Sequence, residues 1–219
     1  MEGIIYKIQP YLESSRLLFV YTPQGKMTLL AKGAQKLNQK SRVIGQFLTR
    51  ISFDVTMLNK TFVTLKNPVV LDDYARIKDD FQTTKYAALI LEIVDKFMIE
   101  IESHETIYQE VVLALSQNDL KIASLAFSLK ILKPLGYELN LTANGNLVKG
   151  VSIAKGGLVY ENDGYSIDLD TKDAILLLKL TYLPYNEHSN DLDESIQRIE
   201  RFIQKYYEYH LHTTLKNLS

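Results

Sequence analysis

The sequence predicts an α+β protein: an all-β domain at residues 1–72 precedes an all-α domain at residues 73–219 that carries a small inserted hairpin. Three observations predict this class. Strand-like apolar segments, partly alternating, fill the first seventy residues. Apolar residues then recur at helical spacing beyond Asp73, which is typical of amphipathic helices. The length of 219 residues also suits one large or two small domains.

Five strand-like segments in the first seventy residues predict a small barrel. Turn signals separate them, as at Thr22-Pro23-Gln24-Gly25, where proline presets φ and glycine tolerates a positive φ. Short strands with hairpin punctuation at this density are typical of barrels. The expected strands cover residues 3–9, 15–22, 26–34, 43–58 and 61–71.

The remainder of the chain predicts helices around one hairpin. Asp119 is a plausible N-cap for one of the helices, and the acidic pairs 72–73 and 79–80 favour helix starts. His210 lies on the apolar stripe of the last helix, so we expect it to be packed. The Gly156-Gly157 pair predicts a hairpin within about residues 140–165. The expected helices include residues 86–97, 107–115, 119–132, 171–182 and 191–215.

Charge is divided unevenly along the chain. Ten basic and three acidic side chains give residues 1–70 a charge of +7, whereas 15 basic and 23 acidic side chains give the remainder −8. Such an asymmetry indicates a basic module that meets a polyanion, attached to an acidic, partner-facing module. The alternative is a chance division of surface charge.

Several classes of protein are disfavoured by what the sequence lacks. It has no cysteine, which excludes disulfides, thiolate catalysis and Cys-ligated metal sites. It has no run of 18 uncharged apolar residues and no secretory signal pattern, so we expect a cytoplasmic protein without membrane contact. Motifs for phosphate binding, serine hydrolysis or zinc proteolysis are missing too. We therefore expect that the protein is not an enzyme, has no catalytic residue and binds no cofactor.

An ordered series of short motifs runs through the chain. It comprises GIIYK at 3–7, ESSRL at 13–17, TPQGK at 22–26, LLAKGA at 29–34, LGY at 135–137, SIAKGGL at 152–158 and YEYHL at 207–211. In this order and spacing the series resembles the RecO recombination-mediator family. Ser15 departs from the pattern, because the family usually has an acid there.

The resemblance implies an N-terminal OB-fold barrel and a C-terminal helical domain. It implies a DNA repair protein that binds single- and double-stranded DNA and anneals complementary strands. With RecR, such a protein helps RecA to replace single-strand-binding protein (SSB), so RecA is an indirect partner. The implied location is the cytoplasm, in association with the nucleoid.

Many family members carry two Cys-x-x-Cys pairs around the hairpin. By spacing, the corresponding positions here are about Asn144, Leu147, Tyr160 and Asp163. Leucine cannot bind a metal, and the others give no soft ligand set. We therefore expect a zinc-less member with no metal site, whose hairpin is held by packing alone.

The basic domain offers candidates for phosphate contacts, because lysine and arginine release the counterions condensed on DNA. We expect binding on the barrel face and its loops, with Tyr11 as the most exposed aromatic ring. A generic OB-fold binder of single-stranded DNA or RNA from another pathway, or a protein-only adaptor, is the alternative. The predicted DNA-binding residues are Lys32, Lys36, Lys40, Arg42, Lys26, Arg16 and Lys7.

The resemblance also implies that the helical domain docks the acidic, Phe-ending tail of SSB. Such a peptide needs an apolar slot for its ring and cations for its carboxylates. The third expected helix offers both, although a solvated helix edge would look similar. The predicted tail-binding residues are Lys130, Lys133, Lys121 and Phe127.

Overall fold

The computed structural model describes residues 1–32, 43–55, 63–99, 103–187 and 193–218. It divides into two compact units, Met1–Val112 and Leu113–Ser219. The expected all-β domain was 1–72, and the last strand of the sheet does end at Asp72. The compact unit that contains the sheet continues through helical residues to Val112.

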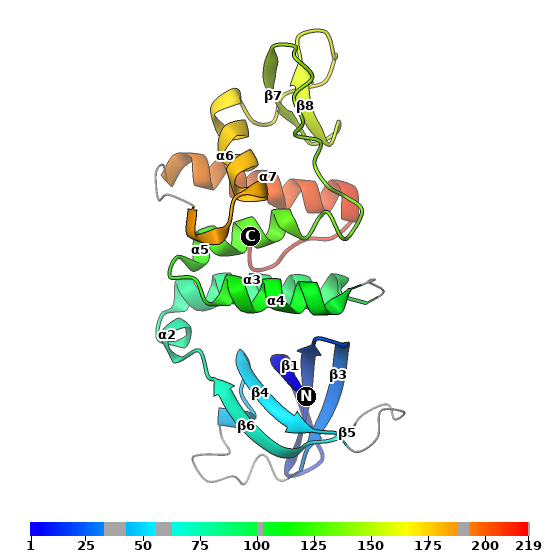
Figure 1. Cartoon of the computed structure of the whole chain (residues 1–219), viewed down its shortest axis with the longest axis vertical. Helices are drawn as coiled ribbons and strands as arrows, with labels where there is room; N and C mark the ends of the chain where they lie inside the picture. Colours follow the sequence, from blue (N-terminus) through cyan, green and yellow to red (C-terminus); the bar gives the residue numbers. More distant parts are fainter. Residues whose placement is uncertain (33–42, 56–62, 100–102, 188–192, 219) are drawn as a thin grey trace. The chain divides into compact units, whose positions relative to one another are not determined.

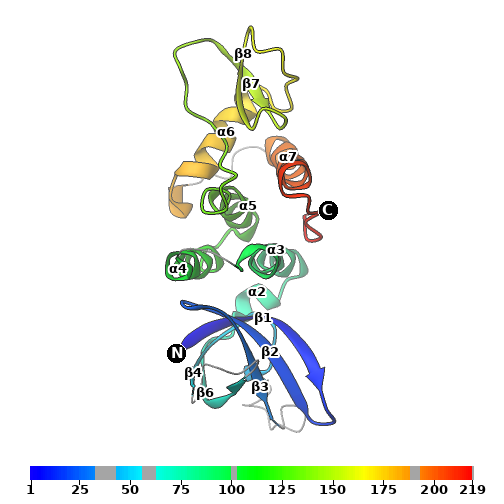
Figure 2. The same ribbon diagram turned by 90° about the vertical axis from the view of Figure 1, so that its right-hand side faces the viewer.

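A curled six-stranded sheet forms the core of the first unit (Figure 1 and Figure 2). Its order is β5-β3-β2-β1-β4-β6, and all neighbours are antiparallel except β3 and β5. The strands are β1 (Glu2–Tyr11), β2 (Ser15–Thr22), β3 (Gly25–Ala31), β4 (Thr49–Asp54), β5 (Val63–Thr64) and β6 (Lys66–Asp72).

The two edges of this sheet are joined by the chain itself. Edge strands β5 and β6 are separated only by Leu65, whose N–H donates to the carbonyl of Leu30 at 3.0 Å. The sheet therefore curls until its edges approach each other, which avoids long unpaired edges. Side chains from β1 to β5 fill the interior, including Ile5, Leu18, Val20, Leu29, Ile51 and Phe53. The OB-type barrel followed by helices confirms the expected fold class.

One expected strand was too long. The strand expected at residues 43–58 begins only at Thr49 and runs to Asp54 as β4, and residues 56–58 lie outside the described part of the chain. Leu48 has a φ of 55°, and the N–H of Gln46 donates to the carbonyl of Val43 in a turn. Residue 48 is buried, and its N–H donates to the carbonyl of Ile5 at 2.9 Å. The apolar run before β4 is thus a compact turn that fills the core.

Helices α2 (Ala75–Lys78), α3 (Phe81–Phe97) and α4 (His104–Leu115) follow the sheet. The acidic pairs serve helix starts as expected, because Asp80 accepts from the Thr83 N–H at 2.7 Å and Asp72 accepts from the Tyr74 N–H at 2.7 Å. α3 packs against β1. Within the described ranges, no helix combines the length and apolar character needed to cross a membrane.

The second unit is helical around the expected hairpin. Asp119 caps α5 by accepting from the Ile122 N–H at 3.0 Å, and Asp170 caps α6 by accepting from the Asp173 N–H at 2.9 Å. α5 contacts both α6 and α7, and β7 packs against α6. The last helix ends four residues earlier than expected, because His212 takes a φ of 51°. The elements are α5 (Leu120–Lys130), β7 (Val148–Ser152), β8 (Gly157–Tyr160), α6 (Thr171–Tyr182), the short η1 (Tyr185–Glu187) and α7 (Asp193–Leu211).

Candidate nucleic-acid interface

Four of the seven predicted DNA-binding cations lie in the described part of the barrel. Lys7, Arg16 and Lys26 are on β1, β2 and β3, and Lys32 directly follows β3. The other three, Lys36, Lys40 and Arg42, lie outside the described residues.

Lys7 and Lys26 both contact the carboxylate of Asp95 on α3. We call these three residues the Asp95 cluster. Their ammonium nitrogens lie 3.8 and 4.0 Å from the two Asp95 carboxylate oxygens, and Lys26 also donates to the Asp95 carbonyl. Each lysine lies over an aromatic ring, Lys7 at 5.2 Å from the Phe19 centroid and Lys26 at 5.8 Å from that of Tyr6. Both ammonium groups are therefore held in place, with their charge partly neutralised.

The pKa of Lys26 reflects this environment. Burial lowers the pKa, Asp95 opposes that change, and the neighbouring charge of Lys7 lowers it further. An added anion would stabilise both charged lysines, just as Asp95 does. The Asp95 cluster is therefore electrostatically suited to a phosphate, provided that the phosphate displaces the carboxylate.

Arg16 and Lys32 form a second group at the far end of the β2–β3 hairpin. Arg16 pairs with Ala31 across the hairpin, and its Nη1 donates to the Gly45 carbonyl at 3.0 Å. Strand alternation places Arg16 on the face of β2 that carries Leu18, whereas Phe19 is on the other face. Lys32 is exposed. The described cations thus form two groups rather than one continuous patch.

The aromatic side chains of the barrel are mostly structural. Tyr6, Tyr21 and Phe53 are buried, and the expected exposed ring, Tyr11, is half-buried at the end of β1. The half-buried Phe19 was not among the predicted site residues, although it lies directly under Lys7. Asp95 was missed as well, since nothing local in the sequence relates it to lysines about 70 or more residues away.

The predicted SSB-tail residues are not gathered into one slot. Phe127 is 0% exposed within α5, so its ring does not line the surface. The Lys130 ammonium donates to the carbonyls of Thr181 and Leu183 at 3.2 and 2.8 Å, where it caps the end of α6. Lys133 has a side chain that is 73% exposed, 4.0 Å from a Glu138 oxygen. Lys121 lies 3.9 Å from a carboxylate oxygen of Glu200.

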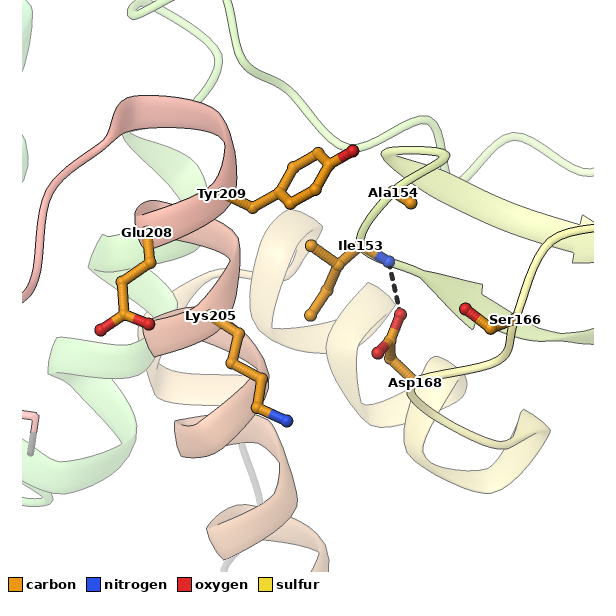
Figure 3. A pocket seen from close by; sticks show the side chains of 7 residues that line it. All are labelled: Ile153, Ala154, Ser166, Asp168, Lys205, Glu208 and Tyr209. Carbon is orange, nitrogen blue, oxygen red and sulfur yellow. Dashed lines mark hydrogen bonds between the residues drawn. The ribbon is translucent and has the colours of Figure 1, made fainter.

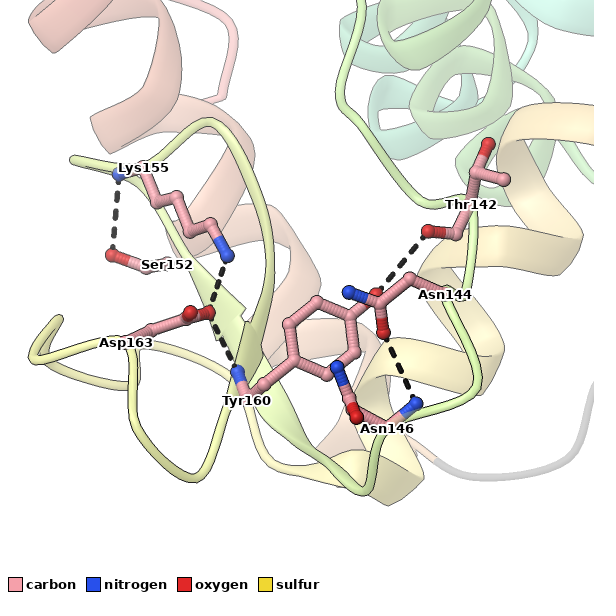
Figure 4. Close-up of polar contacts among 7 residues, drawn as sticks. All are labelled: Thr142, Asn144, Asn146, Ser152, Lys155, Tyr160 and Asp163. Carbon is pink, nitrogen blue, oxygen red and sulfur yellow. Dashed lines mark hydrogen bonds and ion pairs between the residues drawn. The ribbon is translucent and has the colours of Figure 1, made fainter.

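The hairpin is not held by packing alone, which corrects our expectation. Asp163 accepts from the Tyr160 N–H at 2.8 Å and pairs with the Lys155 ammonium (Figure 4). The Tyr160 hydroxyl donates to the Thr142 carbonyl at 3.2 Å. The Asn144 side chain accepts from the Asn146 N–H at 3.1 Å. Tyr160 and Asp163, at two of the four family ligand positions, therefore connect the hairpin to neighbouring segments, whereas Asn144 stabilises its own turn.

These residues do not fit a zinc ion. The fourth position, Leu147, has no donor atom, and the Asp163 carboxylate is already engaged by Lys155 and Tyr160. Across the described ranges, no three His, Cys, Asp or Glu side chains gather in a group that could hold a metal. Hydrogen bonds from Lys155 and from the Tyr160 N–H lower the pKa of Asp163.

Comparison with known proteins gives a consistent result. The family model described as "Recombination protein O C terminal" matches residues 78–219. A "DNA repair protein RecO" of Oceanobacillus iheyensis is 25% identical over 95% of this chain and 86% of its own length. A "DNA repair protein RecO" of Bacillus subtilis (strain 168) is 25% identical over 99% of this chain and 91% of its own length. A "DNA repair protein RecO" of Clostridium acetobutylicum is 30% identical over 64% of this chain and 58% of its own length.

Proposed function

This chain belongs to the RecO family of DNA repair proteins, and on that premise we propose that it is a recombination mediator. In this role it binds single- and double-stranded DNA and anneals complementary strands. With RecR, it helps to load RecA onto single-stranded DNA coated by SSB. Its place of action is the nucleoid in the cytoplasm.

The observation that carries this proposal is the charge of the barrel segment. Residues 1–70 have a charge of +7 within a chain of net charge −1. The described part of this segment forms an OB-type barrel, a fold that binds strands of nucleic acid on one face and its adjoining loops. The exposed Lys32 and the lysines of the Asp95 cluster supply contacts that depend on phosphate rather than on base identity.

Annealing by this route needs no catalytic residue. Two strands repel each other through their phosphates, and cations that neutralise those phosphates lower the repulsion. We therefore propose a non-enzymatic activity without nucleotide hydrolysis. Of the predicted tail-binding residues, Lys133 has a side chain exposed enough to receive a carboxylate of the SSB tail.

The test is strand annealing with and without SSB, at two ionic strengths. A mediator anneals both bare and SSB-coated complementary strands, and more slowly at higher salt. A generic OB-fold binder would anneal bare strands only. A protein-only adaptor would produce no salt-dependent shift of single-stranded DNA at all, and either of these results would overturn the proposal.

A further inference from the structure

A pocket of about 450 Å³ lies in the second unit, between α7 and the hairpin with the loop that follows it (Figure 3). Its size is within the range of pockets that bind small ligands. Four of its seven lining residues belong to the SIAKGGL and YEYHL motifs. Its lining residues are Ile153, Ala154, Ser166, Asp168, Lys205, Glu208 and Tyr209.

An exposed aromatic ring forms one wall of the pocket. Tyr209 is 57% exposed, although its neighbours in the YEYHL motif are used for packing. The buried Tyr207 donates from its hydroxyl to the Ser128 carbonyl at 2.7 Å, and His210 Nε2 lies 2.7 Å from the Ile153 carbonyl oxygen. Figure 3 shows the Tyr209 ring beside Ile153 and Ala154. The ring is therefore supported from one side and open to a flat partner.

Two exposed cations precede this ring along α7. Lys205 and Arg201 are one helical turn apart, and Arg201 lines a smaller hollow that shares Lys205 with the pocket. In the part of the chain that the structure describes, neither has an ion pair or a side-chain hydrogen bond, whereas Arg198 pairs with Asp173. Lys205 extends toward the loop that carries Asp168 (Figure 3). Both cations can therefore bind an anion without breaking an ion pair or a hydrogen bond with the described residues.

The opposite wall carries a hydrogen-bond acceptor. Asp168 uses one carboxylate oxygen to accept from the Ile153 N–H at 2.8 Å, which fixes the orientation of the group. Its other oxygen makes no hydrogen bond with the described residues. The Ser166 hydroxyl lines the same wall. The pocket thus combines a ring, the cation of Lys205 and a fixed acceptor, and the adjoining hollow adds the cation of Arg201.

We propose that this pocket binds one nucleotide of a single-stranded nucleic acid. The base stacks on Tyr209, a flanking phosphate lies at Lys205 and Arg201, and Asp168 accepts from an N–H of the base. Every base has a flat face and at least one N–H, so this recognition tolerates any sequence. The proposal rests on the proposed function and adds a second nucleic-acid contact, on the acidic unit.

An acidic peptide fits the pocket less well. The carboxylates of such a peptide would meet those of Asp168 and Glu208, and like charges at close range repel. A nucleotide places its negative charge on the phosphate alone and turns hydrogen-bond donors toward Asp168. The observed charges therefore favour the nucleotide.

The test compares Tyr209→Ala with wild type for binding to a single-stranded oligonucleotide and to the same oligonucleotide with abasic sites. Loss of stacking should weaken binding to the first at least about fivefold, with little change on the abasic strand. Tyr209→Phe keeps the ring and should bind like wild type. Tyr182→Ala, which removes a 49% exposed tyrosine of the same unit, is the matched control.

A second arm tests the phosphate contact. Lys205→Gln should flatten the dependence of log K on log salt by about 0.7, whereas Lys172→Gln, an equal charge change at an exposed site of the same unit, should not. Unchanged affinity of Tyr209→Ala, with wild type still binding, would overturn this inference and leave the proposed function standing. If wild type itself failed to bind, the proposed function would fall first. If Tyr209→Ala lost binding of an acidic, Phe-ending peptide but kept DNA binding, the pocket would be a peptide site.

Discussion

Asp95 holds two of the barrel cations that a phosphate would otherwise contact. Lys7 and Lys26 are on β1 and β3, the two strands that flank β2, and each is positioned over a ring as well as near this carboxylate. Such partly exposed ion pairs contribute little to stability, on the order of 1 kcal/mol or less. The carboxylate therefore affects the charge available to a ligand more than it affects the fold.

Replacing Asp95 by asparagine should strengthen DNA binding, because Lys7 and Lys26 lose their competing anion. We expect affinity to rise about two- to fivefold at low salt and the salt dependence to become steeper. Fluorescence anisotropy with a labelled single strand measures both. Asp79→Asn makes the same charge change at an exposed site of the same unit. Equal gains in the two variants would show that only net charge matters.

Local sequence signals predicted single residues well where their partners are close in the chain. Asp80 and Asp119 were expected at helix starts, and each accepts from an N–H three residues later. The packed state of His210 is confirmed by its contact with the Ile153 carbonyl and by its ring 4.3 Å from that of Tyr206. The partners of Lys26 and Lys130 are 69 and 51 residues away. No local pattern could have revealed those contacts.

At the scale of elements, Lys130 connects α5 to the end of α6. Its ammonium satisfies two carbonyls that the end of a helix leaves without intrahelical donors, and it lies 5.5 Å from the Tyr185 ring centroid. The sequence predicts this lysine as a residue of the SSB-tail site. Its contacts explain its position without a ligand.

Lys130→Met should destabilise the protein by about 1–3 kcal/mol, because two carbonyls lose a charged donor. In thermal unfolding this corresponds to a decrease of several degrees in Tm for a protein of this size. Lys133→Met, at a largely exposed side chain, should leave Tm almost unchanged. Equal Tm values for the Lys130 variant and wild type would remove the capping role and restore Lys130 as a ligand candidate.

The hairpin depends on Asp163 in its charged form. Because the pKa of Asp163 is lowered in the folded state, its contribution is complete above the ordinary value of 3.8. That contribution is lost as the pH falls through the lower folded-state pKa. Asp163→Asn reproduces this loss at neutral pH, and the Tyr160 amide should then exchange its hydrogen faster.

Glu161→Gln, which removes the exposed ion pair with Lys149, is the control for this experiment. It should leave exchange at Tyr160 near the wild-type rate, because it touches neither Asp163 nor the Tyr160 N–H. If Asp163→Asn also left that rate unchanged, the polar contacts would not hold the hairpin.

Element prediction succeeded where periodicity was regular and failed where pairing was non-local. The strand at residues 15–22 matches β2. The strand expected at residues 61–71 is divided at Leu65, because its first part pairs with β3 and its second with β4. The positive φ of Leu48 likewise ends an apolar run that the sequence alone favours as strand. These features follow from closure of the barrel, which local composition does not encode.

At the scale of the molecule, charge separates residues 1–70, which carry +7, from the remainder, which carries −8, and the two units offer different candidate contacts. The barrel unit carries cations for phosphates, and the helical unit adds the Tyr209 pocket within an acidic segment. Both kinds of contact tolerate any base sequence. A protein of this kind is suited to act at any gap or strand pair, as repair requires.

The most direct test is the salt dependence of affinity for two single-stranded oligonucleotides of unrelated sequence, with wild type and a Lys36→Gln, Lys40→Gln variant. We predict affinities within a few-fold of each other and parallel lines of log K against log salt. The variant line should be flatter by about 0.7 for each lost phosphate contact on single strands. An affinity insensitive to salt, or a strong preference for one sequence, would contradict phosphate-dominated binding.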